Sequence, residues 1–166
     1  MFTQDASYLP DTSKMLEIKE NQELNVANLL SYRGKVKQAE LENIGKEMEG
    51  YIQSAGAKCV GNPITAIYAI EGDEIDIELL MQIDKSIDST DKFVFKNQIK
   101  MINAVVASYT GHPMGLQDAC NQLNQYIMEH RLQPITVGYN VTKKADMLSP
   151  ENTEIDVYVG ISPNIL

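Results

Sequence analysis

Two short segments of the chain alternate acidic or tyrosine side chains with aliphatic ones in nearly the same order. The first reads EIDIEL at residues 74–79, and the second reads EIDVYV at residues 154–159. Because successive side chains of a strand point to opposite sides of a sheet, each segment predicts a strand with one aliphatic and one polar face. We expect the aliphatic faces to be buried in a core. The function of the protein therefore depends on what the polar faces contact.

Two further patterns recur in the same order along the chain. SYRG at 31–34 returns as SYTG at 108–111, and PITAIY at 63–68 returns as PITVGY at 134–139. Three matches in one order are hard to obtain by chance. The sequence therefore predicts an internal duplication.

Each SYxG pattern is followed by a segment with helical periodicity. Apolar residues spaced three and four apart predict helices over about 38–54 and about 113–130. The predicted repeats span about 24–92 and about 93–166, and each runs strand, helix, strand, strand. Residues 1–23 precede them as an N-terminal extension.

The remaining pattern sets the expected fold class. Strands are predicted at 24–30, 63–70, 74–81, 93–95, 98–108, 134–139 and 154–159, with a short strand or arm at 15–18 and a loop at 140–150. Alternating strands favour antiparallel sheets that helices cover on one side. We expect an α+β fold of two pseudo-twofold-related repeats, with an antiparallel sheet, helices on one face and a ligand groove on the other.

Composition excludes several classes of protein. The chain has 166 residues, 43% of them hydrophobic, and a formal net charge of −9, which suits a globular fold and disfavours direct nucleic-acid binding. Neither its two cysteines nor its two histidines show the spacing of a disulfide framework, metal site or cofactor site, so no cofactor is expected. No apolar run is long enough to cross a membrane and the start lacks signal-peptide features, so a cytoplasmic protein is expected.

These motifs together resemble a known family. The strand ending in Ser-Tyr-x-Gly, the helix after it, the Pro-Ile-x-x-x-Tyr strand and the closing strand DVYVGI at 156–161 resemble the GyrI-like, or AraC-type effector-binding, domain family over about 24–166. That fold also carries the drug-binding domains of MerR-type multidrug regulators and is related to SOUL haem-binding proteins. One departure is Gly160, at a place where the family often has proline.

The resemblance implies a site for small molecules in the seam between the repeats, on the sheet face away from the helices. Such sites hold aromatic, often cationic, compounds with stacked rings and a buried carboxylate. About 23 residues precede the domain, too few for the DNA-binding helix-turn-helix of the family's regulators, so a stand-alone member is expected. Some stand-alone members resemble gyrase inhibitors, and others resemble hydrolases that open the cyclopropane of DNA-alkylating natural products.

Two acidic residues, Glu154 and Asp156, are candidates for the key carboxylate, and Glu78 is a candidate for contact with the ligand. Glu154 and Asp156 form the polar face of the last strand, either as an ordinary solvated face or as a carboxylate in an apolar groove that attracts a cation or deprotonates a water. Alignment by the closing motif places Glu78 opposite Asp156, whereas the EID match places Glu74 opposite Glu154. Both alignments keep the same residues on the same face, because they differ by the strand period of two.

Tyrosines are the candidate ring contacts. Tyr68 and Tyr139 occupy equivalent points of the two repeats and could sandwich a flat ligand, with Tyr158 beside them. Tyr109 precedes the second helix and Met114 lies at its start, where a flexible side chain suits an adaptable pocket wall. Packing alone would explain each of these residues equally simply.

Three functions remain open at this point. The first is capture of hydrophobic aromatic or cationic small molecules, by a monomer or a homodimer. The second is a hydrolase of the same shape, in which Glu154 or Asp156 activates a water. The third is a protein–protein module that inhibits a larger enzyme, as the gyrase-inhibitor-like members do.

Overall fold

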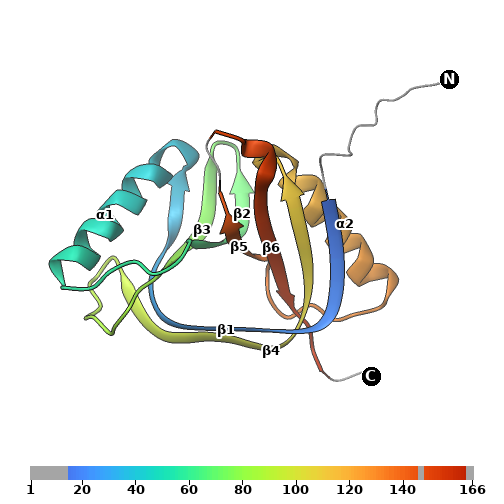
Figure 1. Ribbon diagram of the computed structural model, residues 1–166, viewed down its shortest axis with the longest axis horizontal. Coiled ribbons are helices and arrows are strands. Elements are labelled where there is room, and N and C mark those ends of the chain that lie inside the picture. The colour runs from blue at the N-terminus through green and yellow to red at the C-terminus, as the bar shows by residue number, and fades with distance from the viewer. Residues whose placement is uncertain (1–14, 146–147, 164–166) are drawn as a thin grey trace. The chain divides into compact units, whose positions relative to one another are not determined.

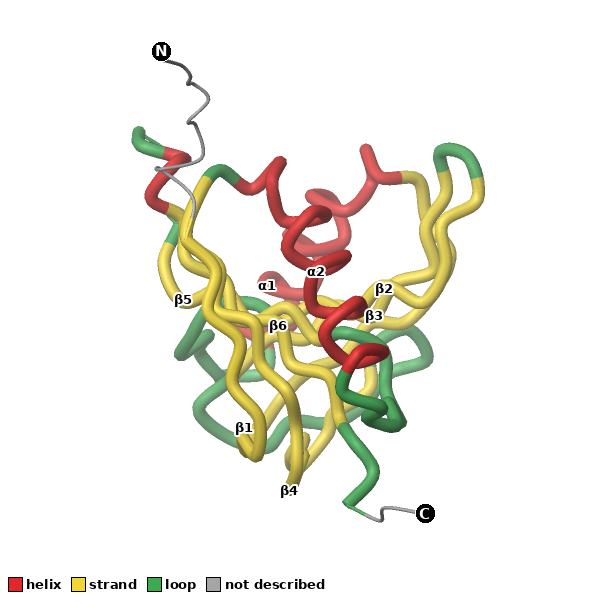
Figure 2. The backbone as a smooth tube through the Cα atoms, turned by 90° about the vertical axis from the view of Figure 1, so that its right-hand side faces the viewer, coloured by secondary structure: helices red, strands yellow, loops and turns green. Residues whose placement is uncertain are grey.

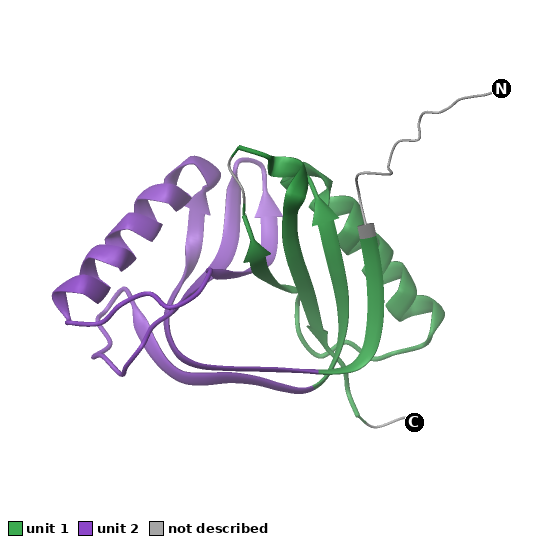
Figure 3. Ribbon diagram, in the orientation of Figure 1, with its two compact units in different colours: residues 1–22, 103–166 green, residues 23–102 purple. Residues whose placement is uncertain are grey.

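A computed structural model describes residues 15–145 and 148–163 and shows an α+β protein with antiparallel strand pairs and two α-helices (Figure 1). The predicted fold class is confirmed to this extent. The chain divides into two compact units (Figure 3). Unit 1 comprises the described parts of residues 1–22 and 103–166, and unit 2 comprises residues 23–102.

Unit 2 holds one helix, three antiparallel strands that pair with one another, and residues 94–102 of the strand β4. Strand β3 lies between β1 and β2, with Gly34 of β1 and Ile67 of β2 both opposite Ile77. The bounds of its elements are β1 Met15–Lys37, the single 3₁₀ turn η2 Gln38–Glu40, α1 Leu41–Ser54, β2 Ile64–Glu71 and β3 Glu74–Gln82. The predicted helix at 38–54 is thus one 3₁₀ turn followed by α-helix.

The core of unit 2 fixes which face of β3 is polar. Ile44, Met48 and Ile52 form the buried stripe of α1. They belong to one core cluster with alternate residues of β3, among them Ile77 and Leu79. Since neighbouring side chains of a strand alternate, the acidic residues of β3 lie on the sheet face away from α1.

Unit 1 repeats this plan with different detail. Strand β6 lies between β4 and β5, and residues 15–22 of β1 run alongside β4 (Figure 3). Leu123 and Ile127 of the helix α2 share a core cluster with Val157 and Val159 of β6. The bounds are β4 Val94–Gly111, η3 Pro113–Gly115, α2 Leu116–Glu129, β5 Tyr139–Lys144, η4 Pro150–Asn152 and β6 Thr153–Gly160.

The strands β1 and β4 are longer than the sequence predicted. Each continues without an intervening loop (Figure 2), and β1 begins at Met15, not at residue 24. Asn21 and Asn28 have φ values of 58° and 56° within β1. Asparagine tolerates this left-handed region, so the strand changes direction there without ending. The polar run at 19–23 therefore does not interrupt the strand, and the described part of the predicted extension, from residue 15 onward, belongs to β1.

The predicted strand at 134–139 and loop at 140–150 are both wrong in position. Pro134 makes one isolated bridge with Ile161, and the regular strand β5 begins only at Tyr139. A local hydrogen bond accounts for the late start of β5. The backbone N–H of Gly160 donates to the side-chain hydroxyl of Thr136 at 2.9 Å, whereas in a regular pair of strands it would donate to a backbone carbonyl.

The repeated SYxG pattern has a packing explanation. A Cβ added to Gly34 would lie 2.7 Å from the hydroxyl of Tyr32, and one added to Gly111 would lie 2.7 Å from the hydroxyl of Tyr109. The tyrosine ring thus lies over the glycine two positions later on the same face of its strand. Glycine is required for this close approach.

Candidate functional site

A buried carboxylate lies on the face of β3 that points away from α1. Glu78 has only 4% of its surface exposed, in a strand whose helix-facing neighbours are aliphatic. A buried charge is costly unless donors surround it, so its contacts are informative.

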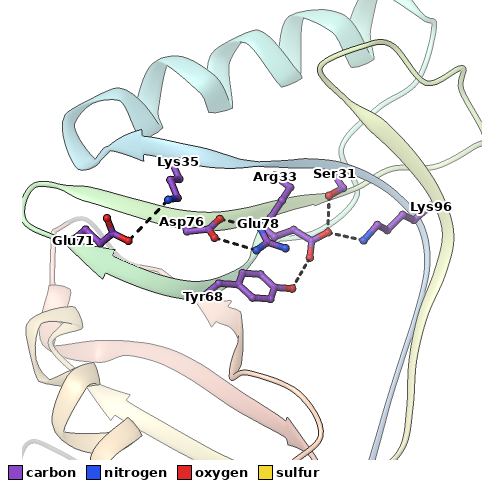
Figure 4. Close-up of polar contacts among 8 residues, drawn as sticks. All are labelled: Ser31, Arg33, Lys35, Tyr68, Glu71, Asp76, Glu78 and Lys96. Atoms are coloured by element: carbon purple, nitrogen blue, oxygen red, sulfur yellow. Dashed lines mark hydrogen bonds and ion pairs between the residues drawn. The ribbon is translucent and has the colours of Figure 1, made fainter.

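Three donors converge on Glu78 (Figure 4). The Ser31 hydroxyl and the Lys96 ammonium each donate to Oε2 at 2.6 Å, and the Tyr68 hydroxyl donates to Oε1 at 3.3 Å. The residues come from β1, β4 and β2, so three strands of unit 2 build the site around the fourth. We call these four residues the Glu78 cluster.

The electrostatic balance of the cluster keeps Glu78 ionised. Burial by itself raises the pKa of this carboxyl. The hydrogen bonds from Lys96 and Ser31, the positive charge of Lys96 and the hydrogen bond from Tyr68 outweigh burial, so the pKa of Glu78 is lowered below its usual range. The cluster therefore holds a carboxylate whose charge an internal lysine balances.

Strand geometry explains how Tyr68 reaches Glu78. The pairing of β2 with β3 shifts register between Ile67 and Ala69, which leaves Tyr68 outside the regular pairs. A β-bulge of this kind redirects a side chain. Ser31 comes to the same face because Leu30 and Val36 of β1 point into the core and the residues between them alternate.

A second ion pair lies next to the cluster. Arg33 donates from Nε and Nη2 to the two carboxylate oxygens of Asp76 at 3.0 and 3.2 Å, and its guanidinium carbon lies 3.5 Å from the centre of the Tyr68 ring. The hydrogen bond from Arg33 lowers the pKa of Asp76. The arginine thus covers one face of the Tyr68 ring while the hydroxyl of that ring contacts Glu78.

A hollow near the β2–β3 turn is small. Its cavity volume is only about 10 Å³, and its lining residues are Lys35, Ala69, Glu71, Glu74, Ile75 and Asp76. Pockets for drug-sized ligands usually measure about 300–1,000 Å³. The hollow does not include Glu78, so it is not the basis of a site.

Unit 1 carries a different carboxylate contact on the polar face of β6. Asp156 is partly buried, with 17% of its side chain exposed, and it contacts the Lys143 ammonium at 3.6 Å. Lys143 is left outside the β5–β6 pairs by a register shift between Thr142 and Lys144. Glu154, which the sequence offered as the alternative key carboxylate, is exposed.

The predicted tyrosines fall into two groups. Tyr139 is the direct strand partner of Tyr158, so both lie on the Asp156 face of unit 1. Burial raises the pKa of Tyr158, and the negative charge of Asp156 adds to this effect. Tyr68 belongs to the Glu78 cluster of unit 2. Tyr109 instead lies 2% exposed and donates to the backbone carbonyl of His112 at 2.5 Å, under the start of α2.

One predicted residue, Met114, lies apart from the contacts described above, and three residues that make such contacts were not predicted. Met114 is 86% exposed and lies in η3, just before α2. Ser31, Arg33 and Lys96 were not proposed from the sequence. The first two lie in the SYRG pattern, whose alternation could have placed them on the polar face, but nothing in the local sequence around Lys96 connects it to Glu78.

Among residues 15–145 and 148–163, no group of three or more histidine, cysteine or acidic side chains is placed to hold a metal ion. Within the same ranges, no helix combines the length and apolar character needed to span a bilayer.

Comparison with known proteins places the fold. No protein-family model and no curated protein matches the sequence. The C-terminal domain of EcmrR superposes with a TM-score of 0.71 at 14% identity, covering 90% of this chain and 98% of that domain. EcmrR in its complex with DNA superposes with a TM-score of 0.70 at 13% identity, and the match covers 90% of this chain but 58% of EcmrR.

Two further solved structures share the fold less closely. A hydrolase from Listeria innocua has a TM-score of 0.55 at 12% identity, covering 89% of this chain and 91% of that one. SAV2435 bound to tetraphenylphosphonium has a TM-score of 0.51 at 9% identity, covering 90% and 94%. The likeness supports the expected GyrI-like, effector-binding fold, whereas membership of that family stays a prediction.

Proposed function

We propose that this protein binds small hydrophobic molecules with aromatic rings, or aromatic cations, on the face of unit 2 that carries the Glu78 cluster. The observation that carries the proposal is a buried, ionised Glu78 beside the ring and hydroxyl of Tyr68, on the sheet face away from α1. A buried charge destabilises the folded state unless donors surround it, and ionised side chains held in this way concentrate at functional sites.

The comparisons support a ligand of this class. The solved structure of SAV2435, which shares the fold, has tetraphenylphosphonium bound, a cation with four aromatic rings. A tyrosine ring supplies stacking area, and its hydroxyl fixes orientation. Tyr68 has both features, and its hydroxyl already contacts the carboxylate.

Isothermal titration with aromatic probes tests the proposal. We expect at least one probe among methyltriphenylphosphonium and triphenylphosphine oxide to bind, and Tyr68→Leu to weaken that binding about tenfold. The matched control is Tyr51→Leu, which removes a tyrosine ring from α1 on the opposite side of the sheet and should leave binding unchanged. Circular dichroism confirms that both variants fold. Absence of heat with either probe up to about 1 mM overturns the proposal.

A second candidate is a hydrolase, which the Listeria innocua hydrolase of the same fold favours. Here Asp156 or Glu154 takes a proton from water, and the oxygen attacks a carbon of an activated cyclopropane. The ring bond breaks, its electron pair enters the conjugated carbonyl system, and a proton is taken up there. Asp156 is the better placed of the two, because it is partly buried beside Tyr158 whereas Glu154 is exposed.

Mass spectrometry of a spirocyclopropyl compound incubated with the protein tests this alternative. Formation of a product heavier by one water, lost in Asp156→Asn, supports it. Turnover that persists when both Asp156→Asn and Glu154→Gln are present shows that these carboxylates are not the base.

A further inference from the structure

Lys96 and Glu78 form an ion pair but differ in their exposure to solvent. Its ammonium lies 2.6 Å from Oε2 of Glu78, yet 39% of the Lys96 side chain is exposed, against 5% for Glu78. The lysine therefore reaches a buried carboxylate from the solvent side. A long, flexible side chain in this position can leave without unfolding the core.

The two carboxylate oxygens also differ in their contacts. Oε2 accepts from both Ser31 and Lys96 at 2.6 Å, whereas Oε1 accepts from Tyr68 at 3.3 Å. The two shortest hydrogen bonds, from Ser31 and Lys96, are thus both made to Oε2. A positively charged ligand that seeks Glu78 meets an ammonium already in place.

This arrangement disfavours the binding of cations and does not disfavour the binding of neutral molecules. A cation must either displace Lys96 or lie close to a like charge in a partly buried site, and both are unfavourable. A neutral aromatic molecule can contact the Tyr68 ring and leave the Glu78–Lys96 pair intact. A carbonyl or phosphoryl oxygen on it can accept a further proton of the ammonium, which has three donors.

We propose that Lys96 determines the charge specificity of the Glu78 cluster: it is a built-in counterion that makes the site select neutral aromatic compounds with an acceptor oxygen over aromatic cations. The proposal rests on the proposed function and decides between its two ligand classes. It follows that removing Lys96 converts the cluster into a cation site.

A matched pair of probes isolates the effect of charge. Methyltriphenylphosphonium and triphenylphosphine oxide carry the same three rings, but the first is a cation and the second is neutral with an acceptor oxygen. We expect the wild-type protein to bind the neutral probe more tightly. We expect Lys96→Met to bind the cation about tenfold more tightly than wild type, and the neutral probe no more tightly. Titrations at about pH 8 keep Glu78 ionised in the variant, because loss of Lys96 leaves burial to raise the pKa of that carboxyl.

Two control variants make the assignment specific. Lys46→Met removes one positive charge from α1, where Lys46 pairs with Glu42 at the surface, and should change neither affinity. The double variant Glu78→Gln with Lys96→Met should lose the gain for the cation, because the carboxylate that attracts it is gone. A gain that persists in the double variant overturns the proposal.

The remaining outcomes separate the two proposals. If wild type binds both probes and Lys96→Met leaves the cation affinity unchanged, the role of Lys96 is overturned and the proposed function stands. If neither protein binds either probe, both fail. If Lys96→Met does not fold, the affinities of wild type decide: the neutral probe should bind more tightly than the cation, and tighter binding of the cation overturns the proposal.

Discussion

The acidic strands of the two units show how one pattern can give two different environments. In unit 2, Glu78 of β3 is buried and receives Tyr68 from a bulge in β2 and Lys96 from β4. In unit 1, the bulge in β5 supplies Lys143, which is 57% exposed and lies 3.6 Å from Asp156. The same backbone feature thus delivers a phenol in one unit and a solvated cation in the other.

The neighbouring strand residues sharpen this contrast. Glu78 is the strand partner of Arg33 in the SYRG pattern, and Glu154 is the strand partner of Thr110 in SYTG. By this pairing Glu154, which is exposed, holds the position that corresponds to Glu78. A duplicated sequence therefore does not imply a duplicated site, because the burial of each carboxylate depends on the side chains that neighbouring strands place around it.

The largest expected effect on stability is that of Lys96→Met. It leaves the buried Glu78 charge without its cation, and we expect a loss of about 2 kcal/mol in the free energy of unfolding, below the usual range for a fully buried pair because Lys96 is partly exposed. Urea denaturation near neutral pH measures it. The matched change Lys143→Met in unit 1 should cost less than about 0.5 kcal/mol. Equal losses would remove the distinction between the units.

The pH dependence of stability is the next test. The pKa of Glu78 is lowered in the folded state, so its contribution is present above the unfolded pKa of about 4.3 and is lost as pH falls through the folded value. We expect Glu78→Gln to flatten the decline of the urea midpoint below about pH 4.3. The matched variant is Glu154→Gln, an exposed residue of β6, which should decline as wild type does. Parallel curves for all three proteins would contradict the assignment.

A smaller effect separates the two SYxG tyrosines. Tyr109→Phe removes a buried hydrogen bond to the carbonyl of His112 and should cost about 1 kcal/mol. Tyr32→Phe removes the equivalent hydroxyl in unit 2, where the ring is only partly buried, and should cost less. Thermal denaturation of the two variants compares them directly. The reverse order would show that the motif is more important to unit 2.

The smallest effect is expected at Arg33. Arg33→Lys replaces the two-point contact with Asp76 by a point charge and reduces coverage of the Tyr68 ring, on a largely exposed side chain. Because solvent screens an exposed ion pair, we expect only a small loss in the free energy of unfolding, measured by urea denaturation. The comparison is Thr110→Ser at the equivalent position of unit 1, which should change nothing measurable. A loss as large as that of Lys96→Met would place Arg33 within the cluster itself.

Much of the local structure followed from residue order. The spacing of Ile44, Met48 and Ile52 predicts α1, and the alternation in EIDIEL and EIDVYV predicts β3 and β6 with their polar faces away from the helices. Two kinds of position could not be predicted in this way: those where a side chain replaces a backbone hydrogen bond between strands, and those where the backbone adopts an unusual conformation within a strand. Thr136 displaced the expected strand from 134–139, and asparagines in the left-handed region let β1 continue through a polar run.

The sequence by itself determined which residues of β3 and β6 are polar and on which face they lie, because the period of a strand is fixed by its backbone. Only the tertiary structure decided that Glu78 is buried while Glu154 is exposed. The partners of Glu78 come from residues 47 positions earlier, 10 earlier and 18 later in the chain. No local pattern records such contacts, since they depend on which strands become neighbours when the chain folds.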